Sequence, residues 1–273
     1  MIVRTNRELK ASYHELTAGD VFIGNLSLKY LKQPMLIDLL QRGVRCLPSP
    51  LAQTLNGSKV AQAFILCDWM LPHTRAISRR TDLIEAMKTS DRNDMGPFVT
   101  KQDGMHCGHG VRRWETLETL YSFMALDEAS YPFVLQPFRE GFTDVRVIIV
   151  GDYVESYTRS NLYNFRVNLG FGGSGSPYNL DEKKEAFCRS AMQRGGFPFA
   201  HLDLMVFENG EYYLSEITLN GGIKGARIGR QELEQKKKDL LEELAGEIAS
   251  WLGSLSLFYE SPLRRGGRGV LGV

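Results

Sequence analysis

Two hydrophobic runs within residues 197–222, FPFAHLDLMVFENGEYYLSEITLNGG, flank the dipeptide Asn209-Gly210. Asn-Gly readily supplies the two positive φ values that a two-residue hairpin turn requires. The pattern therefore predicts a pair of antiparallel strands joined by a tight turn. With a two-residue turn, the predicted cross-strand pairs are Glu208 with Glu211, Phe207 with Tyr212, and Asp203 with Glu216.

The last of these pairs places two carboxylates, those of Asp203 and Glu216, directly opposite each other. Like charges across a strand pair are destabilising, so the arrangement requires a cation between the carboxylates, a shared proton, or a different register. A bound cation would make this end of the hairpin a metal site. The alternative is a solvated sheet edge whose charges extend into water, as most surface charges do.

The N-terminal half alternates short apolar runs with polar turns. The elements predicted for a small α/β piece over residues 1–57 are a strand at 20–26, a helix at 34–42 and a short strand at 44–47. Ser58 is placed to cap a helix over 58–70, which Leu71-Pro72 ends. The residues predicted for its apolar face are Val60, Phe64 and Cys67. A surface helix near 81–89 and a strand at 98–101 follow.

The C-terminal half is rich in predicted strands. The predicted elements are a helix from Glu115 with Leu117, Leu120, Tyr121 and Met124 on one face, a buried strand at 133–138, strands at 144–151 and 153–159, and helices at 181–194 and 231–252. A turn at Gly151-Asp152 places Asp144 opposite Arg159 and Arg146 opposite Tyr157. Residues 170–175 are predicted to form a glycine-rich loop or turn.

Composition adds mainly exclusions. Lys and Arg number 33 against 32 Asp and Glu, so net charge favours neither nucleic acid nor an anionic membrane as the partner. No apolar run approaches the length of a membrane-spanning helix, and the N-terminus has no apolar signal segment. The four cysteines are widely spaced without a CxxC pair, which is typical of a reduced cytoplasmic protein.

A glycine-spaced loop lies between two short apolar strands at residues 101–111, KQDGMHCGHGV. Its glycines let backbone N–H groups approach an anion, and Lys101 can direct its ammonium at the same anion. The loop lacks the ending of a P-loop, so phosphate binding and a surface hairpin remain alternatives. His106, Cys107 and His109 also suggest zinc, but three adjacent residues without a fourth ligand favour a surface loop.

With these residues in place, the chain from 58 to 252 resembles the ATP-grasp superfamily, most closely the branch of the glutamate ligase RimK and prokaryotic glutathione synthetase. The agreement lies in ordered blocks: SKVAQAFILCDWMLPHT, FVTKQDGMHCGHGV, VLQPF, DVRVIIVG, FRVN followed by glycines, and HLDLMVF…YYLSEITLNGGIKG. The resemblance implies an α+β fold in which two lobes, 58–131 and 132–253, clasp ATP. It also implies a shortened pre-grasp piece at 1–57, and a flexible basic tail is predicted at 254–273.

The resemblance assigns roles to individual residues. Those implied to contact ATP are Lys59, Lys101, Gly108, Gly110, the hinge residues Gln136, Pro137 and Phe138, and the ribose contact Asp144. Pro137 stands where relatives often have Glu, and it has no N–H to donate to adenine. The residues implied to line the acyl-transfer centre are Arg146, Arg159, Arg166 and Asn168.

The resemblance also implies Mg²⁺, with Mn²⁺ as an alternative, held by Asp203 and Glu216. Relatives have Glu-x-Asn at this point, whereas this chain has Glu216-Ile217-Thr218 with Asn220 two positions later. Either Thr218 or Asn220 is expected to complete the metal site, and the sequence does not choose between them.

The implied function is that of an ATP-dependent ligase joining a carboxylate to an amine through an acylphosphate. The partners are ATP, a small carboxylate and an amine acceptor, such as an amino acid or an acidic peptide; a homo-oligomer is left open. The basic residues Lys224, Arg227 and Arg230 favour an acidic substrate, with salt-bridged surface as the alternative. Competing functions are a non-catalytic ATP-binding regulator, a small-molecule kinase of the same fold, and an interaction protein.

Overall fold

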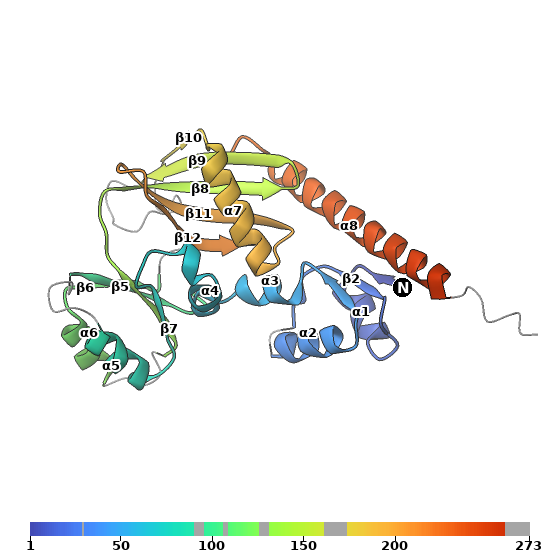
Figure 1. Ribbon diagram of the computed structural model, residues 1–273, viewed down its shortest axis with the longest axis horizontal. Helices are drawn as coiled ribbons and strands as arrows, with labels where there is room; N and C mark the ends of the chain where they lie inside the picture. Colours follow the sequence, from blue (N-terminus) through green and yellow to red (C-terminus); the bar gives the residue numbers. More distant parts are fainter. Residues whose placement is uncertain (29, 90–95, 106–108, 126–130, 161–173, 260–273) are drawn as a thin grey trace, which may run out of the picture. The chain divides into compact units, whose positions relative to one another are not determined.

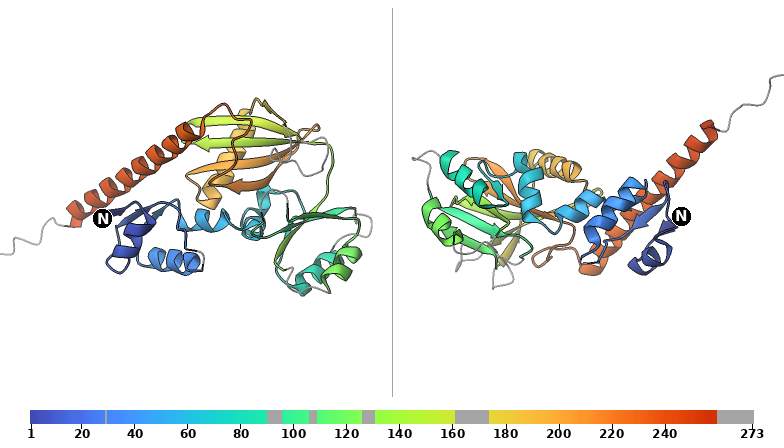
Figure 2. Two further views of the ribbon diagram at one scale, coloured as in Figure 1. Left: turned by 180° about the vertical axis from the view of Figure 1, so that it is seen from behind. Right: turned by 90° about the horizontal axis from the view of Figure 1, so that it is seen from below.

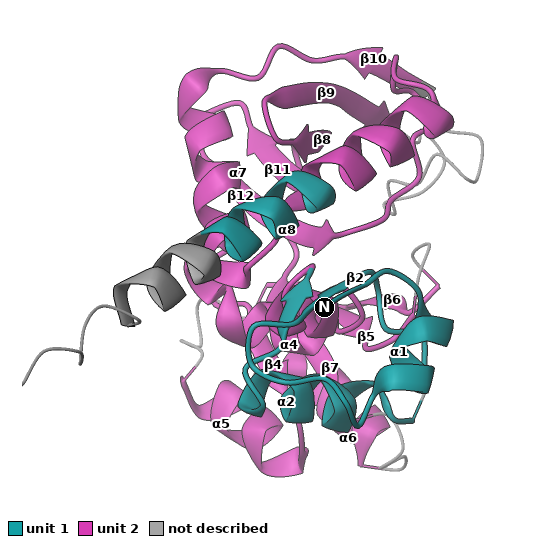
Figure 3. Cartoon of the chain, turned by 90° about the vertical axis from the view of Figure 1, so that its right-hand side faces the viewer, with its two compact units in different colours: residues 1–47, 241–273 teal, residues 48–240 magenta. Residues whose placement is uncertain are grey.

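The computed structural model describes residues 1–28, 30–89, 96–105, 109–125, 131–160 and 174–259, and for residues 251–259 it describes the backbone alone. The chain divides into two compact units, one formed by residues 1–47 and 241–273 and the other by residues 48–240 (Figure 3). Each unit is described by itself below. The boundaries predicted for the lobes from the sequence stay predictions.

The smaller unit contains a three-stranded parallel sheet in the order β1-β2-β3. Its elements are β1 (Ile2–Val3), α1 (Asn6–Ser12), β2 (Val21–Ile23), α2 (Lys32–Gln41) and β3 (Arg45–Leu47). Thr5 and Glu8 form a reciprocal capping box at the start of α1. The core packs Phe22 against leucines from α1 and α2. The predicted strand, helix and strand in this part of the chain are therefore confirmed, and β1 and α1 were not predicted.

The larger unit contains two sheets (Figures 1 and 2). A five-stranded antiparallel sheet has the order β10-β9-β8-β11-β12, formed by β8 (Phe142–Val150), β9 (Tyr153–Ser160), β10 (Ser174–Pro177), β11 (Phe199–Phe207) and β12 (Tyr212–Thr218). A four-stranded sheet has the order β4-β7-β5-β6, formed by β4 (Arg75–Ile77), β5 (Phe98–Gln102), β6 (Val111–Trp114) and β7 (Phe133–Pro137). This mixture of sheets and helices confirms the α+β class.

Helices cover one face of each sheet in the larger unit. Helix α7 (Glu182–Gly195) packs on the five-stranded sheet and begins at the N-cap Asp181 (Figure 1). Helices α5 (Arg80–Thr89) and α6 (Leu117–Met124) bury Leu83 and Leu120 against Phe98 and other residues of the four-stranded sheet. The predicted apolar face of α6 is confirmed.

The hairpin of β8 and β9 has the register that its turn predicts. Val150 pairs with Tyr153 around Gly151-Asp152, and the register brings Asp144 opposite Arg159 and Arg146 opposite Tyr157. A two-residue turn leaves no freedom in the pairing, so counting outward from it is sufficient.

The hairpin of β11 and β12 reaches the predicted result by a different route. Asp203 does pair with Glu216, but next to the turn Tyr212 pairs with Val206 and not with Phe207, so the predicted pairs of Phe207 and Glu208 are wrong. Gly210 N donates to Phe207 O, and Phe207 N donates to Glu211 O. Only Gly210 of the dipeptide has a positive φ, so the turn is wider than predicted.

A bulge restores the register that the wider turn shifts. The pairing moves by one residue between Asp203 and Leu204, which leaves Ser215 as the extra residue on β12. The bulge therefore compensates for the turn, and the two carboxylates meet across the strands.

The helix predicted over 58–70 is shorter and faces the other way. Helix α4 (Lys59–Ile65) is capped by Ser58 as predicted, and the 3₁₀ turn η1 (Cys67–Trp69) follows. Phe64 is 76% exposed and Cys67 is exposed, so the predicted apolar face is wrong. The buried residues are Ala63 and Gln62, and the Gln62 side-chain amide accepts a hydrogen bond from Ile217 N and donates one to Ile217 O of β12. Pairing with a strand backbone makes burial of this polar residue favourable.

Further helices complete the chain. Helix α3 (Pro50–Leu55) was not predicted, and α8 (Arg230–Tyr259) extends past residue 252, where the predicted helix ended. Strand β10 starts at Ser174, within the predicted glycine-rich loop. In the described part of the chain no helix is both long enough and apolar enough to cross a membrane.

Candidate active site

A network of buried charges lies at the centre of the face of the five-stranded sheet opposite α7. Asp203 on β11 is 8% exposed and forms a bidentate pair with Arg146 of β8, with Nε–Oδ1 and Nη2–Oδ2 distances of 2.7 and 2.8 Å. Arg159 on β9 bridges the two carboxylates, with Nε 2.6 Å from Asp144 Oδ2 and Nη2 2.8 Å from Asp203 Oδ2. Two arginines therefore neutralise two aspartates.

The network separates the pKa values of its two carboxylates. Burial raises the pKa of Asp144, and the neighbouring Asp203 charge raises it further against the attraction of Arg159. For Asp203 burial also opposes ionisation, but Arg146 and Arg159 outweigh it and hold its pKa well below the usual range. Asp203 is therefore the firmly ionised centre of this face.

Two lysines extend toward this face from the other elements. Lys59, the first residue of α4, donates to Glu216 Oε1 at 3.0 Å and to Met105 O at 2.9 Å. Lys101 on β5 donates to Ser215 Oγ at 3.2 Å, at the bulge of β12. Burial lowers the pKa of Lys101 to about 8, because the Glu216 charge only partly offsets the loss of hydration.

Asp103 joins the start of the glycine-spaced loop to α4, and the sequence analysis missed it. Its carboxylate accepts from Ser58 Oγ at 3.0–3.1 Å and from Val60 N at 3.1 Å. A carboxylate at a helix N-terminus is favoured by the orphan N–H groups and the helix dipole. This contact fixes the loop beside Lys59. No local pattern predicts a cap supplied from 43 positions along the chain.

The predicted loop glycines are only partly described. Gly110 closes the hairpin of β5 and β6, where its carbonyl accepts from Gln102 N at 2.9 Å. Gly108, like His106 and Cys107, lies outside the described residues, and so do Arg166 and Asn168 of the predicted acyl-transfer centre. Among the residues described, no three or more His, Cys, Asp or Glu side chains form a group able to hold a metal ion.

The predicted hinge residues span the end of β7, with Gln136 and Pro137 as its last two residues and Phe138 directly after it. Gln136 pairs with Val99, and its Nε2 donates to Thr74 Oγ1 at 3.2 Å. Phe138 N donates to Pro97 O at 2.8 Å, and Pro137 has no N–H. The Phe138 N–H is thus engaged within the protein, so the predicted contact with adenine would need a carbonyl group of this segment.

Asp203 and Glu216 have the ligand chemistry that Mg²⁺ prefers, namely two carboxylates facing each other on one side of a sheet. Their negative charges are balanced here by arginine and by Lys59. Thr218 continues the same side of β12 and pairs with His201 of β11. Asn220 lies beyond the strand, and its Oδ1 accepts from Lys237 Nζ at 3.0 Å. Thr218 is therefore the better placed of the two proposed additional ligands.

Several buried polar residues beside the network were not predicted. His201 is 2% exposed, and neither ring nitrogen has a hydrogen-bond partner among the described residues. Burial lowers the pKa of His201 to about 3, so its ring is neutral. Tyr157 OH donates to Gly222 O at 3.2 Å, which Arg146 Nη1 also contacts at 2.9 Å. The sequence offers one signal for His201 and Tyr157, which is that they lie on the same strands as the predicted site residues Asp203 and Arg159.

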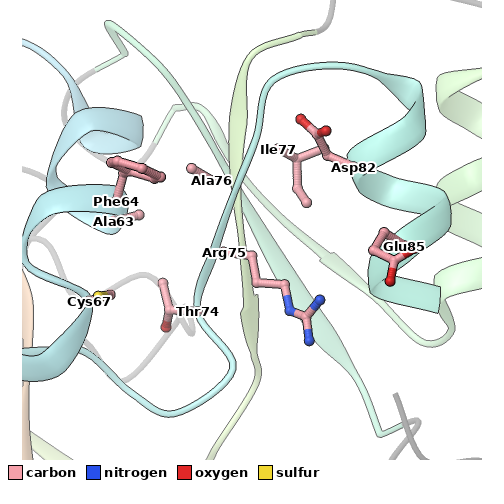
Figure 4. Close-up of a pocket in the computed structure, with 9 residues that line it drawn as sticks. All are labelled: Ala63, Phe64, Cys67, Thr74, Arg75, Ala76, Ile77, Asp82 and Glu85. Carbon is pink, nitrogen blue, oxygen red and sulfur yellow. The ribbon is translucent and has the colours of Figure 1, made fainter. Parts of the chain in front are cut away.

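A pocket of about 400 Å³ has no lining residue in common with this network (Figure 4). Ala63, Phe64 and Cys67 line one side of it, and Ile77, Asp82 and Glu85 line another. None of its lining residues was predicted as a site residue.

The fold is shared with solved enzyme structures at low sequence identity. D-cycloserine synthetase DcsG is 14% identical, with a TM-score of 0.59 over 82% of this chain and 84% of that chain. D-alanine–D-alanine ligase from Bacillus anthracis is also 14% identical, with a TM-score of 0.57 over 90% and 85%. The macrocyclase MdnC from Microcystis aeruginosa, bound with precursor peptide MdnA, is 14% identical, with a TM-score of 0.53 over 84% and 79%.

No curated protein sequence matches the chain. The model of the RimK-like ATP-grasp domain, in contrast, matches residues 69–242. This match spans more than half of the chain and includes every strand of both sheets of the larger unit, while α3 and α4 precede it. The chain therefore belongs to the RimK-like ATP-grasp family.

Proposed function

We propose that this protein is an ATP-dependent carboxylate–amine ligase. The observation that carries the proposal is the convergence of Lys59 and Lys101 on the face that holds the Asp203 network. Such a set of fixed charges suits phosphoryl and acyl transfer, where positioning and charge neutralisation supply most of the catalysis.

The lysines are assigned to the phosphates of ATP. Lys101 has no carboxylate within ion-pair distance in the described part of the chain, so an arriving phosphate would be its first full counter-charge. Lys59 would release Glu216 and bind a phosphate instead, while the Glu216 carboxylate binds the metal ion. Gln136, Pro137, Phe138 and Asp144 are proposed for the nucleoside, and Gly108 and Gly110 for the loop over the phosphates.

Asp203, Glu216 and Thr218 are proposed to hold Mg²⁺, or Mn²⁺ in its place, with Asn220 as a further ligand only if Lys237 releases it. The ion would supply positive charge opposite the phosphate oxygens. Freeing Asp203 leaves Arg146 and Arg159 available on the same face, where they would bind the substrate carboxylate and the phosphoryl group transferred to it.

The reaction follows in two balanced steps. A substrate carboxylate oxygen attacks the γ-phosphorus of ATP, which breaks the bond to the β–γ bridging oxygen and yields an acylphosphate and ADP. The amine nitrogen then attacks the acyl carbon, the bond to the phosphate oxygen breaks, and a proton leaves nitrogen. Arg146 and Arg159, with Arg166 and Asn168 proposed beside them, would stabilise the oxyanion in the second step.

Isotope transfer tests this proposal. The enzyme is supplied with ATP, Mg²⁺ and a panel of amino acids and acidic peptides whose carboxylates carry ¹⁸O. The expected result is ADP, an amide product, and one ¹⁸O in the released phosphate. A stable phosphorylated product without free phosphate would indicate a kinase, and ¹⁸O-free phosphate would exclude the acylphosphate. The panel begins with acidic substrates because the basic residues Lys224 and Arg230 follow the hairpin of β11 and β12, whereas Arg227 pairs with Glu155 at 3.3 Å.

A non-catalytic ATP-binding regulator is the second candidate. Thr218 favours it, because a hydroxyl is a weaker ligand than the amide oxygen that relatives have at this position. Nucleotide binding without substrate-dependent ADP formation across the whole panel would support this candidate. ADP formation gained only in the Thr218→Asn variant would support it further.

A further inference from the structure

The loop between β12 and α8, residues 219–229, is fixed at several points beside the face of the five-stranded sheet that holds Asp203, Arg146 and Arg159. We call this face the acyl-transfer face. At its start, Leu219 N donates to Asn56 Oδ1 at 2.6 Å, and Lys237 Nζ donates to Leu219 O at 3.1 Å. In its middle, Gly222 O accepts from Arg146 and Tyr157. The loop is therefore joined to the residue that pairs with Asp203.

The loop also approaches this face so closely that a side chain at residue 221 would collide with it. A Cβ atom at position 221 would lie 2.8 Å from Arg146 Nη1 and 2.9 Å from His201 Nδ1. Only glycine permits such an approach without displacing the arginine. The position of Arg146 and the path of the loop are therefore set together.

The far end of the loop is held by Glu155 of β9. This carboxylate is 3% exposed, and it accepts from Arg227 N at 2.6 Å, from Ile228 N at 3.2 Å and from Tyr153 OH at 2.6 Å. Arg227 Nε adds a longer contact at 3.3 Å. Burial opposes ionisation of Glu155, but the hydrogen bonds from Tyr153 and the two amides outweigh it and lower its pKa.

We propose that Glu155 is a positioning residue, which fixes the loop 219–229 over the face and through Gly222 holds Arg146 for the transferred phosphoryl group and the substrate. Burying an ionised carboxylate is costly unless its acceptors are used, and here the loop amides use them. The nucleotide lysines lie on other elements and have no contact with Glu155 among the described residues. Glu155 thus affects the position of Arg146 and does not affect nucleotide binding. This inference rests on the proposed function.

The test compares Glu155→Gln with two matched controls in the full-length protein. Glutamine keeps the shape but turns an NH₂ group toward donors that need an acceptor. Arg227→Ala removes a side chain and keeps both amide contacts to Glu155, and Tyr153→Phe removes one hydroxyl donor. The readouts are hydrogen exchange at the amides of residues 227 and 228, calorimetric affinity for ADP with Mg²⁺, and affinity of the ADP complex for inorganic phosphate.

We expect Glu155→Gln to speed exchange at these two amides by roughly tenfold or more and to weaken phosphate binding by a similar factor, with ADP affinity unchanged. Arg227→Ala should leave all three readouts near wild type, and Tyr153→Phe should give a smaller change of the same kind. Unchanged exchange in Glu155→Gln would overturn the proposal. So would faster exchange with unchanged phosphate affinity, or an equal loss of ADP affinity, which would mark a general structural defect.

If Glu155→Gln fails to fold, Tyr153→Phe decides by the same readouts. Because exchange and phosphate binding need no amide product, an inactive protein does not obscure the outcome. Failure of the ligase proposal would appear in the ¹⁸O experiment, whereas failure of the Glu155 proposal would appear here.

Discussion

The two sides of the candidate active site are built on different electrostatic principles. On the five-stranded sheet, Asp144, Asp203 and two arginines form a buried network in which the charges balance. On the other side, Lys101 is buried with a hydroxyl and a carbonyl as its partners in the described residues. The first side is complete without a ligand, while the second gains a counter-charge only when an anion arrives. The difference predicts that substitutions will affect stability on one side and binding on the other.

The largest effect is expected from Asp203→Asn. This change leaves Arg146 and Arg159 buried with one carboxylate between them, and breaking a buried ion pair on one side costs about 3–5 kcal/mol. The free energy of unfolding measured in urea should fall by this amount, and ADP formation should be abolished. Glu208→Gln, at the exposed turn of the same hairpin, is the control and should change neither quantity. An unfolding free energy within about 1 kcal/mol of wild type would show that the balanced charges of the network do not stabilise the fold.

Lys101→Met should show the opposite pattern. Methionine fills similar space without the cost of desolvating an ammonium, so the unfolding free energy should stay within about 1 kcal/mol of wild type or rise slightly. ATP affinity should fall by roughly tenfold to a hundredfold, because a charged hydrogen bond to phosphate is lost. Calorimetry with Mg²⁺ and a non-hydrolysable ATP analogue measures the affinity. A loss of stability as large as that of Asp203→Asn would remove the distinction between the two sides.

Sequence reasoning succeeded where geometry is set locally. The β8–β9 pairing follows from the two-residue turn at Gly151-Asp152, so the meeting of Asp144 with Arg159 could be counted in advance. The meeting of Asp203 with Glu216 was predicted correctly although the turn is wider, because the bulge at Ser215 cancels the difference. A bulge leaves no sequence signal strong enough to predict it from this hairpin alone.

Sequence reasoning failed where a residue is explained by a distant partner. Gln62 breaks the apolar pattern of α4 because it pairs with the backbone of Ile217. Asp103 caps a helix that precedes it by more than forty residues, and Glu155 binds amides of a loop far along the chain. These contacts depend on tertiary placement, which hydrophobic periodicity does not report.

The lowered pKa of Lys101 gives a pH test of the same comparison. With a pKa of about 8 in the free protein, Lys101 is partly neutral at pH 8, and bound phosphates should raise its pKa. Nucleotide binding should then take up about half a proton at pH 8, and affinity should fall as pH rises above 8, toward tenfold per unit. Calorimetry in buffers of different ionisation enthalpy measures the uptake.

Lys101→Met is the control for proton uptake, since it has no ammonium to titrate at this position and should abolish the uptake near pH 8. Uptake that persists in this variant would assign the proton to another group. Uptake absent from the wild type would mean that Lys101 is already fully charged before the nucleotide binds.

The smallest effect is expected at the turn that leads to the carboxylate pair. Gly210 has a φ of 88°, and alanine in this region costs roughly 1 kcal/mol, so Gly210→Ala should lower the unfolding free energy by about that much. ADP formation per folded molecule should not change, because Asp203 also pairs with Arg146 on the central strand β8, and the bulge at Ser215 separates it from the turn. A fall in turnover larger than the loss of folded protein would mean that the turn sets the register of Asp203 and Glu216. In that case the geometry of the charged network would depend on the hairpin turn. The contrast between a five-stranded sheet that is complete by itself and a Lys101 side that needs a ligand would then be lost.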